Sequence, residues 1–245
     1  MWYIAPDCGE KSAGEGATRQ VMRAYGKEKK MSYKVVIFDL DGTILDTLED
    51  LKESTNAALA ANGYPARTLD EVRRFVGNGI GKLIERAVPQ GTSKEAIEKT
   101  LESFKEHYGI HCADHTKPYD GILELLEDLR KNGIQTAVVS NKADFAVQEL
   151  CGRYFPGAFD FVVGEREGIR RKPCPDSVFE VLKTLKKTAD EAVYIGDSDV
   201  DVETARQAGM DGIFVSWGFR GREFLTEHGA TCIVDTPEEL EQLIV

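Results

Sequence analysis

The chain has 245 residues, 42% of them hydrophobic and 30% charged, the composition of an ordinary globular protein with room for a core and a second small module. Its formal net charge of −11 argues against nucleic acid or an anionic membrane surface as the main partner. No run approaches the roughly 20 apolar residues that span a membrane, no secretory leader is present and the five cysteines are scattered, so we expect a reduced, cytoplasmic enzyme.

The first 30 residues differ in character from the rest of the chain. Residues 1–30 combine four glycines with mixed charges and show no sustained periodicity, so we expect a dispensable N-terminal extension. The alternative is a short amphipathic helix over residues 17–24 that docks on the body of the protein.

The first predicted strand ends in two acids. Residues 35–38 form a short apolar run rich in β-branched side chains, the pattern of a buried strand, and Asp39, Asp41 and Gly42 follow it. In an open parallel sheet, ligands bind at the carboxyl ends of the strands. Two acids crowded there repel each other unless a cation or a shared proton compensates, so the pair suits a nucleophile, a proton carrier and a divalent metal. The alternative is a solvated turn, because Asp-Gly is common in turns.

A helical segment then interrupts the sheet pattern. Residues 47–117 show helical spacing of apolar positions and no convincing strand. We expect a first helix that ends at residues 62–63 and further helices over 69–76, 79–88 and 93–108. The insertion starts directly after the two acids, where a mobile lid would close over them.

Three histidines lie near the end of this insertion. His107, His111 and His115 are four residues apart, a spacing that could bring them to one helix face as metal ligands. Gly109 and Pro118 indicate, however, that the helix is ending there, which favours a solvated junction over a second metal site.

The remaining chain alternates between helical and strand patterns. Helices are expected over 121–132, 143–152, 175–187, 199–208 and 237–243, and strands over 134–139, 159–163, 192–195, 212–215 and 231–234. This alternation predicts an α/β fold with a doubly wound parallel sheet. Polar residues follow these strands as they follow the first, so all could meet at one edge of the sheet.

Four of these polar segments resemble the motifs of the haloacid dehalogenase-like phosphohydrolases. The segments are Asp39-Leu40-Asp41-Gly42-Thr43, Ser140 after the second strand, Lys172 beside Pro173, and Gly196-Asp197 followed by Asp201. The closest pattern is that of the phosphoglycolate phosphatases. The resemblance implies a Rossmann-like core over residues 31–46 and 118–245, with a helical cap domain over residues 47–117.

The resemblance also implies a role for each motif residue. Asp39 would be the nucleophile that forms an aspartyl-phosphate, and Asp41 would protonate the leaving alcohol and then activate water. Mg²⁺ would be held by Asp39, the backbone carbonyl of Asp41 and Asp197, with Asp201 in a supporting position. The groups expected to bind phosphate are Gly42, Ser140, Asn141 and Lys172. In the cap, Asn78 in a tight glycine loop is the candidate for substrate specificity.

Several alternatives stay open at this point. Ser140 and Asp197 could each be helix N-caps. A pyrophosphatase or a sugar-phosphate phosphatase or mutase of the same superfamily would carry similar motifs. From other classes, a phospho-accepting receiver domain or a catalytically silent binding module is possible. The partner we expect is a small phosphorylated metabolite, acted on by a monomer or a homodimer.

Overall fold

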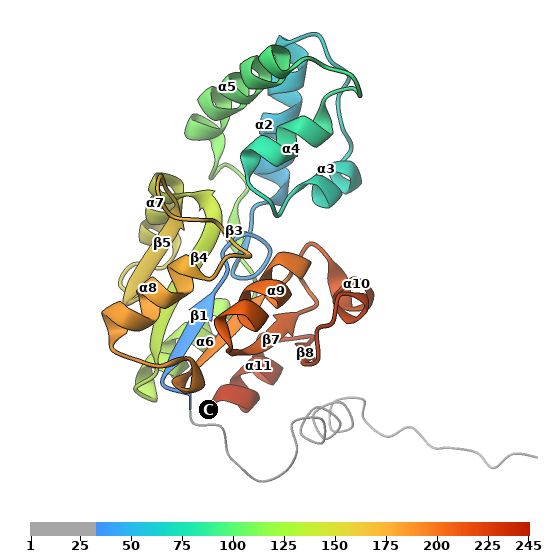
Figure 1. The fold of residues 1–245 in the computed structure, drawn as a ribbon. Helices are drawn as coiled ribbons and strands as arrows, with labels where there is room; N and C mark the ends of the chain where they lie inside the picture. The colour runs from blue at the N-terminus through green and yellow to red at the C-terminus, as the bar shows by residue number, and fades with distance from the viewer. Residues whose placement is uncertain (1–32) are drawn as a thin grey trace, which may run out of the picture. The chain divides into compact units, whose positions relative to one another are not determined.

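A central sheet of six parallel strands organises the protein. The computed structural model describes residues 33–245, and the expected extension over residues 1–30 lies outside them. The strand order is β5-β4-β1-β6-β7-β8 (Figure 1). The strands are β1 (Val35–Phe38), β4 (Gln135–Ala143), β5 (Phe161–Glu165), β6 (Ala192–Gly196), β7 (Asp211–Val215) and β8 (Ile233–Val234). The doubly wound parallel sheet is therefore confirmed.

The first strand lies at the point where the winding of the sheet reverses. Residues of β1 pair with β4 on one side and with β6 on the other, so that Phe38 is level with Val138 and with Ile195. All four residues of β1 are fully buried, as its continuous apolar run predicts. The residues that follow β1 consequently emerge at the topological switch point, where doubly wound folds bind ligands.

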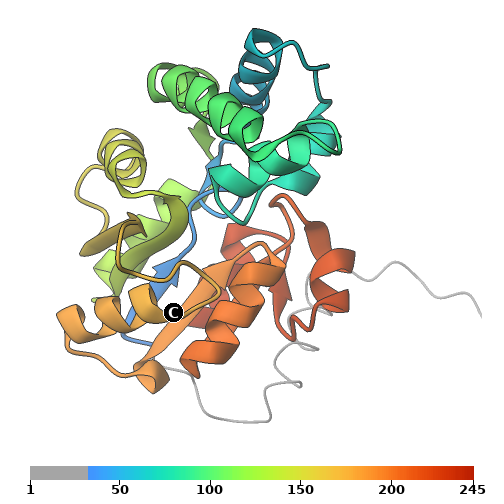
Figure 2. The ribbon, with the colours of Figure 1, turned by 45° about the horizontal axis from the view of Figure 1, so that its top comes forward.

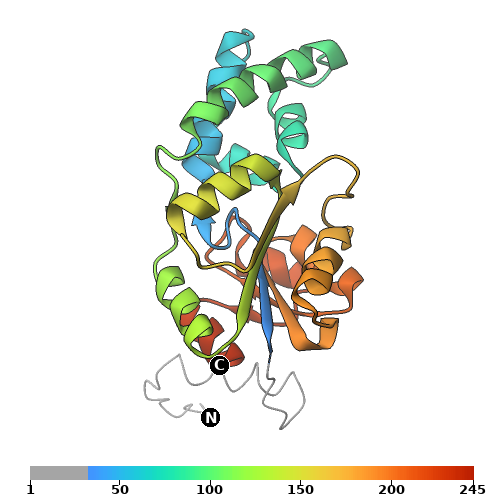
Figure 3. The same cartoon turned by 90° about the vertical axis from the view of Figure 1, so that its left-hand side faces the viewer.

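Helices cover both faces of the sheet. They are α6 (Ile122–Lys131), α7 (Asp144–Tyr154), α8 (Asp176–Leu185), α9 (Asp199–Ala208), α10 (Gly221–Glu227) and α11 (Pro237–Ile244), with a 3₁₀ turn, η1 (Ala189–Glu191). Figure 3 views the sheet from its edge, with α6, α7 and α11 on one side and α8 and α9 on the other. Except for α10, the sequence predicts each of these α-helices to within a few residues. No helix within residues 33–245 is long and apolar enough to cross a membrane.

Four further helices form a layer beyond the carboxyl ends of the strands (Figure 2). They are α2 (Leu48–Ala61), α3 (Leu69–Phe75), α4 (Ile80–Ala87) and α5 (Lys94–His111), and α2 packs against α5. The predicted helical insertion after the first strand is confirmed. The prediction that the last helix ends near Gly109 is wrong, because α5 continues through this glycine to His111.

A short antiparallel ladder joins the two chain segments that lead into and out of these helices. Strands β2 (Leu45–Asp46) and β3 (Lys117–Pro118) pair in this ladder. The sequence does not predict it, because strands of two residues have no readable period. The cap boundaries at residues 47 and 117 stay a prediction, and the ladder lies at both of them.

Asp50 ties the same two segments together. Its buried carboxylate accepts hydrogen bonds from the backbone N–H groups of His115 and Thr116, at 2.9 and 2.8 Å, and from the Thr116 hydroxyl at 2.7 Å. Buried acceptors with this many donors stabilise one local geometry. The connections to the cap helices are therefore held as a unit.

The three spaced histidines do not share one set of partners. His107 Nδ1 lies 3.0 Å from the Ser54 hydroxyl, and His111 Nδ1 lies 2.7 Å from a carboxylate oxygen of Asp114. His115 has Glu53 as its acidic neighbour. The ring centres of His107 and His111 lie 4.3 Å apart, whereas His115 lies with the acids Asp50 and Glu53, so the three histidines do not converge on one metal site.

Candidate active site

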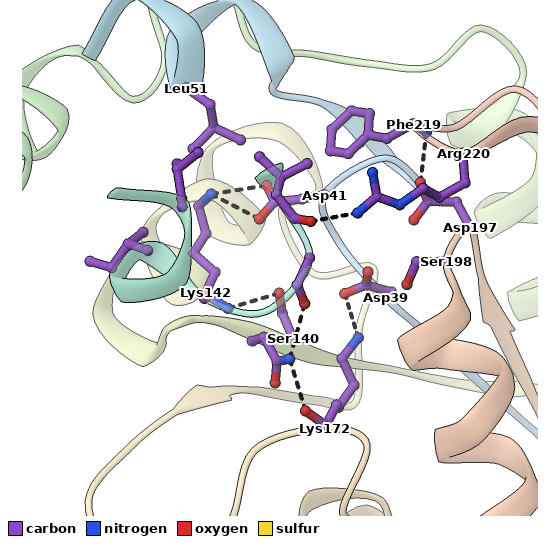
Figure 4. A pocket seen from close by; sticks show the side chains of 16 residues that line it. Asp39, Asp41, Leu51, Ser140, Lys142, Lys172, Asp197, Ser198, Phe219 and Arg220 are labelled. Atoms are coloured by element: carbon purple, nitrogen blue, oxygen red, sulfur yellow. Dashed lines mark hydrogen bonds and ion pairs between the residues drawn. The ribbon is translucent and has the colours of Figure 1, made fainter. Parts of the chain in front are cut away.

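Polar residues at the carboxyl ends of β1, β4 and β6, together with Lys172 in the loop after β5, line one cavity between the sheet and the cap helices (Figure 4). The core side of this cavity includes Asp39, Asp41, Ser140, Asn141, Lys142, Lys172, Asp197 and Ser198. The structure thus brings together most of the residues that the motifs single out, from segments up to 158 positions apart. Parallel strands explain this convergence, because their carboxyl ends share one edge of the sheet.

Lys172 connects two acids of the site. Its Nζ lies 2.8 Å from Asp39 Oδ1 and 2.8 Å from Asp201 Oδ1, and it donates to the Tyr194 hydroxyl at 3.0 Å. The whole group is buried. The lysine therefore fixes the carboxylate of Asp39 at the bottom of the cavity.

Asp201 has its oxygens occupied by protein groups. Besides Lys172 and the Tyr194 hydroxyl at 3.1 Å, it accepts from the Ser198 backbone N–H at 3.1 Å and the Ser198 hydroxyl at 2.6 Å. This carboxylate is fully buried. Through these contacts Asp201 fixes the positions of Lys172, Tyr194 and Ser198.

Asp197 lies in a slot that requires two glycines. A Cβ on Gly42, which has a φ of +85°, would lie 2.4 Å from Asp197 Oδ2. A Cβ on Gly218 would lie 2.3 Å from Asp197 Cβ. The carboxylate accepts from the Phe219 backbone N–H at 2.7 Å and the Thr43 hydroxyl at 3.4 Å. Ser198 is the N-cap of α9, so the interpretation of Asp197 as an N-cap is wrong.

A separate lysine holds Asp41. Lys142 Nζ lies 2.9 and 3.0 Å from the two carboxylate oxygens of Asp41, and the Thr47 hydroxyl donates to Asp41 Oδ1 at 2.8 Å. Burial lowers the pKa of Lys142, but the Asp41 carboxylate and the Tyr108 side chain together more than offset this effect, and the pKa lies above its ordinary value. Lys142 is therefore a buried cation at neutral pH.

Strand β4 carries three consecutive site residues to the cavity. The strand continues through Ser140 and Lys142 to Ala143, which is the N-cap of α7. The interpretation of Ser140 as an N-cap is consequently wrong. Its hydroxyl instead accepts from the Lys142 backbone N–H at 3.2 Å and faces the cavity.

Three acids of the site carry more negative charge than the protein balances. Side-chain oxygens of Asp39, Asp197 and Asp201 lie within 4.8 Å of one another. Within residues 33–245, Lys172 is the one lysine or arginine that forms ion pairs with this group. If all three acids were ionised, one ammonium against three carboxylates would leave two negative charges.

The electrostatics of the buried acids reflect this excess. Burial, with the neighbouring Asp201 and Asp41 carboxylates, raises the pKa of Asp39 to about 7 against the opposing effect of Lys172. Burial, together with Asp201 and Asp39, holds the pKa of Asp197 well above its usual range. Clustered carboxylate oxygens whose ionised forms lack enough compensating cations are a donor set that fits a hard divalent cation such as Mg²⁺.

The cap side of the cavity is apolar and is tied to the core by backbone contacts. Val76, Gly77, Gly79 and the start of α4 line it. The Asn141 side-chain amide donates to the Gly77 carbonyl at 3.3 Å. Asn78, between the two glycines, does not line this cavity. Its Oδ1 instead accepts a hydrogen bond from Arg86 of the cap at 2.8 Å.

A match to known proteins decides the family. A family model for haloacid dehalogenase-like hydrolases matches residues 36–215. The chain belongs to this family. The resemblance that the four motifs indicate is therefore confirmed, and a receiver domain is excluded.

Individual relatives cover most of the chain. A phosphoglycolate phosphatase of Pseudomonas savastanoi pv. phaseolicola is 32% identical over 213 residues, which cover 84% of this chain and 78% of that protein. An N-acetylmuramic acid 6-phosphate phosphatase of Pseudomonas aeruginosa is 33% identical over 214 residues, 86% of this chain and 95% of that one. A solved structure of a candidate phosphoglycolate phosphatase from Lactobacillus delbrueckii subsp. bulgaricus has a TM-score of 0.84 and 43% identity over 88% of this chain and 99% of its own.

Two cations of this haloacid dehalogenase-like hydrolase were not predicted as site residues. Lys142 directly follows Ser140 and Asn141, but its partner Asp41 is 101 positions away, and no local sequence pattern can indicate such a pair. Arg220 lines the cavity from the loop before α10 and donates to the carbonyls of Arg73 and Val76 in the cap, both at 2.6 Å. Arg220 lies in a loop, where no periodic pattern could have indicated its role in the site.

Proposed function

We propose that this haloacid dehalogenase-like hydrolase is a Mg²⁺-dependent phosphatase that hydrolyses small phosphorylated acids through an aspartyl-phosphate at Asp39. The observation that carries the proposal is the pair of acids after β1. Asp39 and Asp41 line the same cavity, and each has its own buried lysine. Such a pair provides a nucleophile and a separate proton carrier within one pocket.

The proposed reaction has two steps. In the first, a carboxylate oxygen of Asp39 forms a bond to phosphorus, the bond from phosphorus to the leaving oxygen breaks, and Asp41, which enters this step in its protonated form, gives its proton to that oxygen and becomes the carboxylate that Lys142 contacts. In the second, water bonds to phosphorus while the Asp39 oxygen leaves, and Asp41 accepts a proton of the water. Phosphate departs and both acids return to their starting state.

In this proposal, Lys172, Ser140 and Asn141 would hold the phosphoryl oxygens. The ammonium of Lys172 touches Asp39 and would also face negative charge that develops on the phosphoryl group. The Ser140 hydroxyl and the backbone N–H of Asn141 would donate to these oxygens, and both residues line the same cavity. Gly42 has a further role, because the space of its absent side chain is filled by Asp197.

The Mg²⁺ ion would be held by Asp39, Asp197 and the backbone carbonyl of Asp41. Asp201, with its oxygens already engaged by Lys172 and Ser198, would support this set without contacting the ion. Bound Mg²⁺ supplies positive charge that neutralises phosphoryl oxygens and keeps Asp39 ionised.

Small phosphorylated acids, with 2-phosphoglycolate first, are the proposed substrates. The cap helices enclose the cavity with apolar side chains, and Arg220 offers a cation at its edge. The relatives named as phosphoglycolate phosphatases support this class. The relative named for N-acetylmuramic acid 6-phosphate makes a sugar phosphate the competing candidate.

A panel of phosphorylated metabolites tests the substrate proposal. The purified protein is assayed with Mg²⁺ for phosphate release from 2-phosphoglycolate, sugar phosphates including N-acetylmuramic acid 6-phosphate, pyrophosphate and p-nitrophenyl phosphate. We expect the highest kcat/KM with 2-phosphoglycolate. A kcat/KM at least about tenfold higher for another metabolite would overturn this choice while leaving the phosphatase proposal intact.

A further inference from the structure

Both carboxylate oxygens of Asp41 are bound by neighbouring side chains, unlike those of an acid that faces only solvent. Lys142 contacts both of its oxygens and is only 4% exposed, and Thr47 donates to one of the same oxygens. A carboxylate with a single contact can still rotate about its side-chain bonds. Contacts to both oxygens from one side remove that freedom, so the direction of the carboxylate is determined by its donors.

We propose that Lys142 is a positioning residue, which aims Asp41 at the leaving oxygen of the substrate, and that Tyr108 of the cap takes part in this alignment. The inference rests on the proposed phosphatase function and assigns the residues that make its general acid effective. Neither residue carries a role in the motifs described above.

Tyr108 brings the cap into the arrangement. This residue of α5 is buried, and Lys142 Nζ lies 4.9 Å from the centre of its ring. The ring is itself stacked on Phe104 of the same helix, with centroids 5.2 Å apart. An ammonium over an aromatic face is attracted to it. Lys142 is consequently held between a core carboxylate and a cap side chain.

The same contacts allow a different explanation, in which Lys142 only compensates a buried charge. The two explanations differ in what they predict for substrates with different leaving groups. When Asp39 bonds to phosphorus, an alkoxide leaves poorly and needs the proton of Asp41. A nitrophenolate leaves readily without that proton. Misdirecting Asp41 should therefore slow alkyl phosphates selectively, whereas a general loss of structure or charge should slow both kinds of ester.

The test compares 2-phosphoglycolate or another alkyl phosphate that the wild type hydrolyses with p-nitrophenyl phosphate, in wild type and Lys142→Met. The quantity is kcat/KM, which reports the step in which the leaving group departs. We expect a loss of about 100-fold on the alkyl ester, in the range of general acid catalysis, and a loss of less than about fivefold on the nitrophenyl ester. Tyr108→Leu should give a smaller loss with the same selectivity.

Lys34→Met is the matched control. Lys34 also pairs with an acid, Glu191, but it lies at the opposite, amino end of β1. This variant should leave both kcat/KM values unchanged. Lys142→Arg keeps a cation that can contact Asp41. A smaller loss of kcat/KM on the alkyl ester in Lys142→Arg than in Lys142→Met would further show that the contact to Asp41 matters.

The outcomes separate the inference from the function on which it rests. Equal losses on both esters, or no loss on either, would overturn the positioning role of Lys142. If Lys142→Met does not fold, as its melting curve would show, the same comparison in Tyr108→Leu decides, and a uniform effect there overturns the inference. A wild type that hydrolyses no phosphate ester with Mg²⁺ would contradict the proposed phosphatase instead.

Discussion

Replacing Gly218 with alanine tests whether the placement of Asp197 governs the metal site. A Cβ at this position would lie 2.3 Å from Asp197 Cβ and 2.3 Å from the Gly42 carbonyl oxygen. Ordinary van der Waals contact begins at 3.4 Å, so a neighbour must move by about 1 Å. Gly218 does not have the positive φ that Gly42 has. The effect would therefore come from collision, with no contribution from an unfavourable backbone conformation.

The size of the effect follows from this displacement. A catalytic group misplaced by about 1 Å can reduce the rate by roughly 100-fold, and we expect that loss in kcat/KM. The Mg²⁺ concentration for half-maximal activity should rise as well, because Asp197 is a proposed ligand. Overpacking destabilises by about 1–3 kcal/mol, which corresponds to a fall in Tm of roughly 2–12 °C for a chain of this size.

The assay measures phosphate release over a Mg²⁺ titration, together with a thermal melt of each variant. Gly152→Ala is the control, because Gly152 is an exposed residue of α7 with nothing within 4 Å of an added Cβ. Alanine in a helix is favoured over glycine by up to about 1 kcal/mol, so its Tm should stay or rise and its activity should not change. A Gly218→Ala enzyme with more than about half of the wild-type kcat/KM and an unchanged Mg²⁺ requirement would refute the reasoning.

Three further predictions concern other contacts. Asp50→Asn should lower the free energy of unfolding by about 1–3 kcal/mol, because the backbone N–H of Thr116 would face an amide in place of a carboxylate. Urea denaturation measures this change, and an unchanged unfolding midpoint would argue against a stabilising role of Asp50. Asn78→Ala should change the ranking of natural substrates more than it changes p-nitrophenyl phosphate hydrolysis, because the hydrogen bond from Arg86 to Asn78 is lost. An unchanged ranking would show that Asn78 does not determine substrate specificity. Activity should require Mg²⁺ and fall in excess Ca²⁺, which prefers larger and more flexible coordination, and full activity of metal-free protein in EDTA would overturn the metal role of Asp197.

The sheet and its site edge could be predicted because their signals are local. Each strand of the sheet contains an apolar run, and polar residues stand where this run ends in β1, β4 and β6. Parallel topology then requires that these ends share one edge. Asp39, Asp197 and Lys172 could thus be placed in one site without knowledge of any contact.

Features that depend on long-range pairing could not be predicted in this way. Lys142 meets Asp41 only because β4 pairs with β1, and either residue alone is an ordinary charge. The β2–β3 ladder consists of two residues on each side, too few to show alternation. Asn78 faces Arg86, eight positions later, because of how α3 and α4 meet. In the first two cases the determining partner lies outside the window in which periodicity can be seen, and Asn78 lies in a loop, where no periodicity continues.

The most direct test of the account is the turnover of Asp39→Asn. Asparagine has nearly the shape of aspartate, but its amide is a poor nucleophile, so the fold should persist while the aspartyl-phosphate can no longer form. With saturating Mg²⁺ and the best substrate of the wild type, we expect no measurable kcat from a variant whose Tm and circular dichroism show a folded protein. A folded Asp39→Asn enzyme that keeps about a tenth or more of the wild-type kcat would contradict the assignment of Asp39 as the nucleophile.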